Sequence, residues 1–174
     1  VLSGLGVVNS HFSTESGMLM DEAIMNVILE KYHIRIGRKA AETLKMALGV
    51  EWDLNRDTRI CEVCGISTIT ELPVKIAVTG EIVAQALNPI LYRIFSGITS
   101  VIQMTPPAIL GDIREHGIVL IGGVAQLKGL KELVLKVTDM KAHVADHPSY
   151  VNAVGAGSAL EYMDYFRDSL QDLH

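Results

Sequence analysis

Cysteine, aromatic residues and clusters of basic charge are all scarce in this chain of 174 residues, and each scarcity excludes a class of protein. The two cysteines are too few for a disulfide framework or a four-ligand zinc site. The net charge is −5 and no extended run of Lys and Arg occurs, so we expect no nucleic-acid partner. Aromatic residues make up only 5% of the chain, so the core must consist of aliphatic side chains and methionine.

A long uninterrupted apolar run is also absent. The most apolar region, residues 82–104, contains Arg93 near its middle and Pro89 as a helix breaker. An arginine at the centre of a bilayer costs about 2.5–3.5 kcal/mol. We therefore expect a buried helix kinked at Pro89 and no membrane insertion by this chain. The first residues also lack the basic and apolar pattern of a secretory signal.

The cysteines and histidines do not form a recognisable metal or redox motif. Cys61 and Cys64 lie in a segment with strand-like composition, where residues three apart point to opposite faces. We expect them to be reduced. His143 and His147 are four apart, but Pro148 and a predicted strand end prevent them from sharing a helix face. We expect neither a metal site nor a catalytic triad.

Hydrophobic periodicity predicts alternating strands and helices, which indicates an α/β or mixed α+β fold. Expected strands are two short ones within 1–14, a hairpin of 58–69 with 71–78, and single strands at 117–122 and 141–146. Expected helices cover 16–34, 38–49, about 80–104, 108–116, about 126–138 and 149–166, with a polar loop at 51–57. Residues 36–104 have the character of a small lobe inserted into a larger one.

A glycine pair, Gly122 and Gly123, separates the apolar strand GIVLIG from the next helix. Glycines at such a point let a flat or charged ligand come close to the backbone, because no Cβ stands in the way. Gly155 and Gly157, within the last expected helix, would meet the same crevice of an α/β unit. Taken alone, most glycine pairs are simply turns.

Two segments resemble the actin-like ATPases, and the bacterial MreB group in particular. Residues 105–130, TPPAILGDIREHGIVLIGGVAQLKGL, are similar to that group's PPEL-x-x-DI-x-x-xGI-x-LTGGGA-x-L-x-GL. Residues 21–45, DEAIMNVILEKYHIRIGRKAAETLK, are similar to its DEAI … Y … IGE-x-TAE-x-IK. The resemblance implies an α/β fold, the ribonuclease-H-like domain II of actin with an inserted small α+β lobe. Residues 1–34 and 105–174 would form the large lobe, and residues 35–104 the small lobe.

The resemblance also implies a site for ATP or ADP with Mg²⁺ in the full-length protein. Gly122 and Gly123 would let adenosine and the α-phosphate approach the backbone. Glu42 and Lys45 match the family's AE-x-x-K and would lie beside the ribose and adenine. The residues alone leave another interpretation open, because a Glu–Lys pair one turn apart is usually a solvated helix face.

Three further positions follow from the same resemblance. Gly17 matches the second glycine of the family's GGD, near the ribose. Arg38 lies on the helix one turn before Glu42 and is a weaker candidate for a contact. Gly155 and Gly157 would lie behind the base, as packing residues more than as ligands.

The chain departs from the family pattern at two nucleotide-facing positions. Val124 replaces the third glycine of GGG, and Met18 replaces the acidic residue of GGD. A β-branched side chain disfavours positive φ and places methyl groups where backbone would face the ligand. The family's two phosphate loops and its activating acidic residue are absent, so the chain resembles a C-terminal half. We expect no ATP hydrolysis by this fragment alone.

The function implied by the resemblance is that of a cytoskeletal filament that determines cell shape. The intact protein would bind ATP between two domains and polymerise head to tail, with residues 53–80 meeting the large lobe of the next subunit. The partners are then other copies and the missing N-terminal domain. Localisation would be cytoplasmic, with membrane association only through that missing half. Two alternatives remain: a degenerate, non-hydrolysing actin-fold scaffold, and another actin-fold ATPase of the chaperone-like or plasmid-segregating kind.

Overall fold

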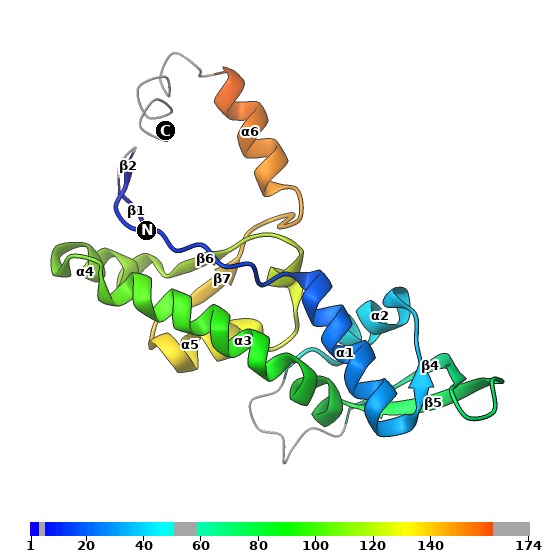
Figure 1. Ribbon diagram of the computed structural model, residues 1–174. Coiled ribbons are helices and arrows are strands. Elements are labelled where there is room, and N and C mark those ends of the chain that lie inside the picture. Colours follow the sequence, from blue (N-terminus) through cyan, green and yellow to red (C-terminus); the bar gives the residue numbers. More distant parts are fainter. Residues whose placement is uncertain (4–5, 51–58, 162–174) are drawn as a thin grey trace.

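The computed structural model describes residues 1–3, 6–50 and 59–161, in which helices and strands alternate (Figure 1). The first elements are β1 (Leu2–Ser3), β2 (Gly6–Val7), α1 (Gly17–Tyr32), β3 (Ile34–Arg35), α2 (Arg38–Leu48), β4 (Ile60–Ser67) and β5 (Pro73–Thr79). They are followed by α3 (Gly80–Gln103), α4 (Pro107–His116), β6 (Ile118–Leu120), the 3₁₀ turn η2 (Gly123–Gln126), α5 (Leu130–Thr138), β7 (Ala142–Val144) and α6 (Val151–Glu161).

The main core lies where α1, α2 and α3 meet the antiparallel sheet β3-β4-β5. β4 and β5 form the predicted hairpin, with Val63 opposite Ile76 in register. Side chains alternate along β4, so that Val63 is buried while its neighbours Glu62 and Cys64 are exposed. One face of this sheet therefore covers the helices and the other faces solvent.

α1 forms because its apolar residues recur every fourth position and both of its ends are capped. Met20, Ile24 and Ile28 are buried in one stripe against α2 and α3. The helix ends at His33, whose left-handed backbone (φ 55°) lets its N–H donate to the carbonyl of Leu29. The start of α1, where the candidate site lies, is thus held on the core by its own buried stripe.

The second sheet is a parallel pair, β6 and β7, in which Val119 lies opposite His143. α5 connects the two strands and packs on β7 as well as on α3. α6 follows β7 and projects away from the other elements (Figure 1), with no buried residue along its length.

Several expected elements differ from those observed. The helix expected over 126–138 is interrupted, because Gly129 has φ 83° and separates η2 from α5. The strand expected at 117–122 is only three residues long. The polar loop at 51–57 and residues 162–166 of the last expected helix lie outside the described residues. α3 continues through Pro89, and none of the described helices is long and apolar enough to cross a bilayer.

The two cysteines lie on β4, as expected from the strand-like composition of that segment. Both are free; Cys64 is exposed and Cys61 is half-buried against the core. The prediction that they point to opposite faces of a strand is confirmed.

Candidate functional site

Three segments that are far apart in the sequence meet at the start of α1. A Cβ built on Gly17 would lie 3.4 Å from Cγ2 of Val124 in η2 and 3.5 Å from Nζ of Lys45 in α2. Both distances are ordinary van der Waals contacts, so the three segments pack directly on one another at Gly17. The structure brings together three of the residues singled out from the sequence.

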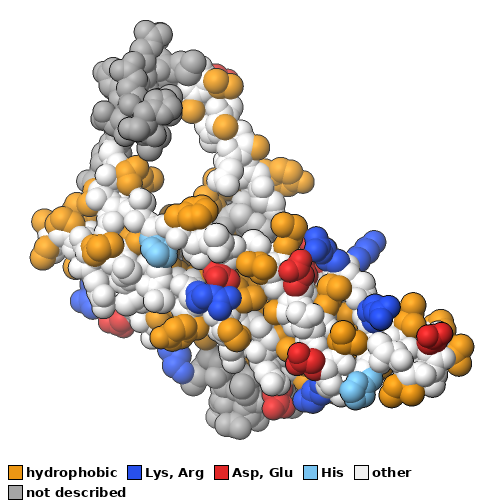
Figure 2. Space-filling view, in the orientation of Figure 1, with side chains coloured by type: hydrophobic (Ala, Val, Ile, Leu, Met, Phe, Trp, Pro, Cys, Tyr) orange, Lys and Arg blue, Asp and Glu red, His pale blue; other side chains and the backbone are white. Residues whose placement is uncertain are grey.

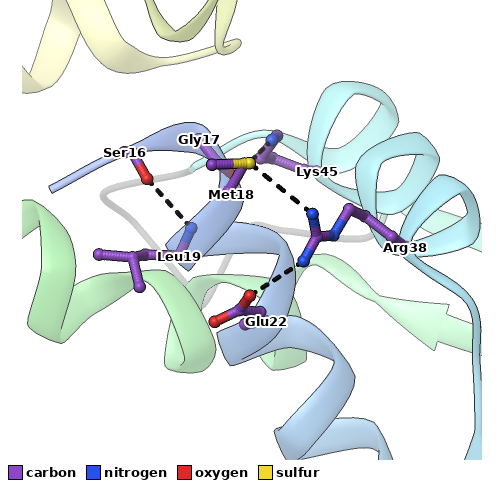
Figure 3. A network of polar contacts seen from close by, with 7 residues as sticks. All are labelled: Ser16, Gly17, Met18, Leu19, Glu22, Arg38 and Lys45. Atoms are coloured by element: carbon purple, nitrogen blue, oxygen red, sulfur yellow. Dashed lines mark hydrogen bonds and ion pairs between the residues drawn. The ribbon is translucent and has the colours of Figure 1, made fainter.

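Lys45 is buried at the centre of this meeting point, with only 8% of its side chain exposed. Its Nζ donates to the carbonyl oxygen of Gly17 at 3.0 Å and lies 2.6 Å from Oδ1 of Asp21. Figure 3 shows the amine directed at Gly17. The interpretation of Glu42 and Lys45 as one solvated helix face is therefore wrong for Lys45, whereas Glu42 is exposed.

Asp21 was missed in the sequence, although the pattern contains a signal for it. The buried stripe of α1 includes Asp21 beside Met20, and the buried stripe of α2 includes Lys45 beside Leu44. Two opposite charges placed within the apolar stripes of neighbouring helices predict a buried ion pair, because an unpaired buried charge is very costly. Oδ1 of Asp21 has no hydrogen-bond partner among the described residues, so the Lys45 ammonium alone balances it.

Arg38 extends across the surface beside this pair. Its Nη2 lies 3.0 Å from Oε1 of Glu22, and its Nη1 lies 3.7 Å from Sδ of Met18 (Figure 3). Met18 occupies the position where the resemblance expects an acid, and here it accepts from Arg38 instead. Because the Arg38–Glu22 pair is more than half exposed, it contributes at most about 1 kcal/mol. A ligand could therefore displace Arg38 at low cost.

The approach to α1 is fixed by a cap and by an ion pair. Ser16 accepts from the backbone N–H of Leu19 at 3.4 Å and so caps the first turn. Just before it, Glu15 accepts from Nε and Nη2 of Arg93 on α3 at 2.5 and 3.1 Å. This double hydrogen bond holds the pKa of Glu15 below its ordinary value of 4.5. The turn that carries Gly17 is thereby attached to α3.

Gly122 and Gly123 present open backbone at the end of β6. No described atom lies within 4 Å of a Cβ built on either residue. Gly122 has φ 85°, a conformation that L side chains rarely adopt, and its N–H donates to the carbonyl of Pro148. The glycine pair is thus a hydrogen-bonded turn with free space in front of it, as a ligand approaching the backbone would require.

The loop after β6 is fixed in place by contact with the C-terminal end of α2. A Cβ on Gly129 would lie 1.8 Å from the carbonyl oxygen of Val50. The N–H of Val50 donates to the carbonyl of Lys128, whose Nζ donates to that of Ala47. These contacts hold the glycine turn against the helix that carries Glu42 and Lys45.

The remaining predicted residues are Val124, Gly155 and Gly157. Val124 is half-buried and packs on the core, with one methyl group beside Gly17. Gly155 and Gly157 are exposed on α6, and no described atom lies within 4 Å of a Cβ at either. Their expected packing role is therefore not observed. Within the described ranges, no three His, Cys, Asp or Glu side chains gather as a metal site would require.

The arrangement suits ligand binding. The glycine turn offers backbone without side chains, the exposed Glu42 carboxylate has no partner among the described residues, and Arg38 is a releasable cation. Lys45 is fully engaged, so it holds α1 to α2 and does not face solvent.

The MreB/Mbl protein family matches residues 1–168. The cell shape-determining protein Mbl of Bacillus cereus is 32% identical over 164 residues, and MreB of Escherichia coli is 33% identical over 164 residues. Both alignments cover 94% of this chain but only 49% and 47% of those relatives. The chain thus spans about half the length of the curated relatives it matches.

Solved structures show the same fold. MreB5 of Spiroplasma citri bound to ADP superposes with a TM-score of 0.78 at 22% identity, over 87% of this chain and 46% of that one. The MamK double helical filament superposes with a TM-score of 0.66 at 21% identity, over 79% and 42%. The fold is therefore actin-like, and the chain belongs to the MreB/Mbl family.

Proposed function

We propose that this chain forms one side of an ATP or ADP site whose other side belongs to the remainder of a longer MreB-like protein. The observation that carries the proposal is the meeting of Gly17, Lys45 and Val124 beside the open Gly122–Gly123 turn. The S. citri MreB5 structures, bound to ADP and to AMPPNP, superpose on this chain with TM-scores of 0.78 and 0.77. That likeness supports a nucleotide as the ligand.

Each residue of the site then has a distinct role. Gly122 and Gly123 admit adenosine and the α-phosphate close to the backbone, because no side chain occupies that space. Glu42 accepts hydrogen bonds from ribose hydroxyls. Lys45 acts as a positioning residue that fixes Gly17 and the first turn of α1. Arg38 leaves its ion pair with Glu22 and binds the ligand instead.

Mg²⁺ and hydrolysis belong to the rest of the protein in this proposal. The described residues offer no cluster of three metal-binding side chains, so Mg²⁺ would be held by the nucleotide phosphates and by residues outside this chain. Without the phosphate-binding loops that the resemblance implies, this chain alone does not hydrolyse ATP.

The nucleotide would lie between a large lobe, residues 1–34 and 105–174, and a small lobe, residues 35–104. Support comes from the sheets, since β4 and β5 lie within the small-lobe range and β6 and β7 within the large-lobe range. α1 bridges them: its start meets η2, while its end leads into β3. This division assigns the two sides of the candidate site to different sheets.

We further propose that the whole protein polymerises in the cytoplasm and contributes to cell shape. The B. cereus and E. coli relatives are cell shape-determining proteins, and MamK is solved as a double helical filament. Membrane association, where it occurs, would come from the part of the protein outside this chain.

Binding of a fluorescent ATP analogue tests the nucleotide proposal. The protein to use is a chimera in which this chain replaces the matching region of B. cereus Mbl. Gly123→Val adds a side chain in open space at a position without positive φ, so the fold should survive. We expect at least tenfold weaker binding from Gly123→Val and unchanged binding from Gly111→Ala, a glycine on α4 with equally free space. Equal binding by both variants would exclude the glycine turn from the site.

A non-hydrolysing scaffold remains the second candidate. It is favoured by the methyl group of Val124 beside Gly17 and by Met18 at the position of an acid. The same titration distinguishes the nucleotide-binding protein from the scaffold. If the chain is a scaffold, the unmodified chimera shows no saturable binding of the analogue.

A further inference from the structure

The segment that precedes α1, residues 9–16, lies along α3 as a strap. Near the start of the strap, the side-chain amide of Asn9 donates to the carbonyl oxygen of Val101 at 3.2 Å. At its end, the carboxylate of Glu15 accepts from the guanidinium of Arg93. Arg93 and Val101 are about two helical turns apart, so the strap follows one face of α3. Figure 1 shows this segment running past α3 to the start of α1.

A third contact, between His11 and the backbone of α3, lies between these two. A Cβ built on Gly97 would lie 2.5 Å from Cδ2 and 2.9 Å from Nε2 of the His11 ring. Gly97 is about one helical turn from Arg93 and one turn from Val101. Because this glycine has no side chain, the imidazole rests directly on the helix. The strap is thus in contact with α3 at three successive turns.

The strap leads directly into the candidate site. The side chain of Glu15 is only 8% exposed, so its two hydrogen bonds from Arg93 are largely shielded from water on the side of the strap. Next comes Ser16, which caps α1, and then Gly17, whose carbonyl oxygen accepts from Lys45. Only Ser16 separates the anchored Glu15 from Gly17. The position of the first turn of α1 therefore depends on the position of the strap.

We propose that the strap regulates nucleotide affinity, with Asn9 and Arg93 as positioning residues that hold Gly17 where the ligand binds. While the strap lies on α3, the first turn of α1 is fixed beside η2 and α2. When the strap leaves α3, this turn gains conformational freedom and only a fraction of the molecules presents the site correctly. The apparent affinity falls by that fraction. The inference rests on the proposed nucleotide site and adds its regulation by α3.

Two hydrogen bonds to the same carbonyl oxygen provide a matched pair of variants. Asn9 donates to Val101 from the strap, whereas the hydroxyl of Thr105 donates to Val101 at 2.7 Å from just beyond the end of α3. In the Mbl chimera, Asn9→Ala should weaken binding of the fluorescent ATP analogue at least threefold. Thr105→Val removes the other hydrogen bond, leaves the strap in place and should bind normally. Equal affinities of the two variants would overturn the proposal.

Substitutions of Arg93 test the other end of the strap. Arg93→Gln loses the cation that binds Glu15 and should weaken binding of the analogue by the chimera at least fivefold. Arg93→Lys keeps a cation that can donate to the same carboxylate, so it should recover most of the affinity. Thermal unfolding of each variant shows that binding is measured on folded protein. Binding by Arg93→Lys as weak as that of Arg93→Gln would contradict the positioning role.

Hydrogen exchange detects release of the strap without any nucleotide. The amides of Leu19 and Met20 donate to Ser16 in the first turn of α1. Mass spectrometry of the nucleotide-free chimera should show at least threefold faster exchange of this turn in Asn9→Ala than in Thr105→Val, and equal exchange would overturn the proposal.

The analogue titration also separates this inference from the proposed function. If the unmodified chimera binds no analogue, the nucleotide site fails and the inference fails with it. If the unmodified chimera and Asn9→Ala bind equally well, the nucleotide site stands and only the regulation by the strap is excluded.

Discussion

At the scale of single residues, the buried pair of Asp21 and Lys45 controls the geometry of the candidate site. Lys45 reaches both the carboxylate of Asp21 and the carbonyl of Gly17, so one ammonium group links α2 to the first turn of α1. A buried ion pair contributes little compared with apolar residues of the same size, but removing one partner leaves an uncompensated charge.

Lys45→Met should therefore destabilise the chain by about 3 kcal/mol. The double variant Asp21→Leu with Lys45→Met removes both charges and should recover most of that loss. Urea unfolding followed by circular dichroism measures both free energies. A cost below about 1 kcal/mol for Lys45→Met would show that the pair is not buried in solution.

The Glu15–Arg93 pair predicts a dependence of stability on pH. The hydrogen bonds from Arg93 lower the pKa of Glu15 in the folded state. The pair therefore stabilises the fold above pH 4.5, and this contribution is lost as the pH falls through the lowered pKa. Arg93→Gln should raise the carboxyl pKa of Glu15 toward 4.5, as measured by ¹³C NMR.

The same substitution should lower the thermal unfolding midpoint at pH 7, and the difference from the unmodified chain should shrink as the pH falls below 4.5 and through the lowered pKa of Glu15. Arg114→Gln is the control, because it removes an exposed ion pair with Asp139 far along the chain from Glu15. An unchanged Glu15 titration in Arg93→Gln would contradict the assigned contact.

At the scale of elements, the glycine between η2 and α5 explains how the site loop is held. Gly129 combines φ 83° with a Cβ position only 1.8 Å from the carbonyl oxygen of Val50. Gly129→Ala would both strain the backbone and push the loop away from α2, at a cost of about 2–4 kcal/mol. Gly111→Ala lies in a helix with free space and should be neutral or slightly stabilising. Chemical denaturation distinguishes the two; equal stabilities would mean that the loop is not clamped to α2.

The sequence predicted most elements because their signals are local. The β4–β5 hairpin follows from alternating apolar residues, and α1 from a stripe repeating every fourth position. The break at Gly129 was not predicted, because its cause is a contact with Val50, nearly 80 residues earlier. In the site, the glycine turn was predicted because the glycine pair lies between a predicted strand and a predicted helix. The burial of Lys45 was not predicted, because it depends on Asp21 of another helix. Contacts between elements are set by packing, which periodicity in one segment does not show.

At the scale of the whole molecule, the outer face of the β4–β5 sheet is the surface that the filament hypothesis uses. Ile60 and Ile66 are 62% and 51% exposed there, and Figure 2 shows apolar side chains gathered at this end of the molecule. Beside them the Lys75–Glu62 ion pair keeps the face polar in part. Exposed apolar residues on a sheet face are typical of an interaction surface.

Ile66→Glu should abolish nucleotide-dependent sedimentation of the Mbl chimera without unfolding it. Ile66 lies opposite Arg35 in the register of β3 and β4, so the new carboxylate gains a cross-strand cation while the sheet keeps its hydrogen bonds. Leu29→Glu makes the same change at a partly exposed position on α1, outside the 53–80 segment, and should sediment normally. A pelleting assay with and without ATP, paired with thermal unfolding of each variant, measures both effects. Normal sedimentation of Ile66→Glu would show that this face is not part of the subunit contact. Loss of sedimentation in both variants would mean that added negative charge alone prevents assembly.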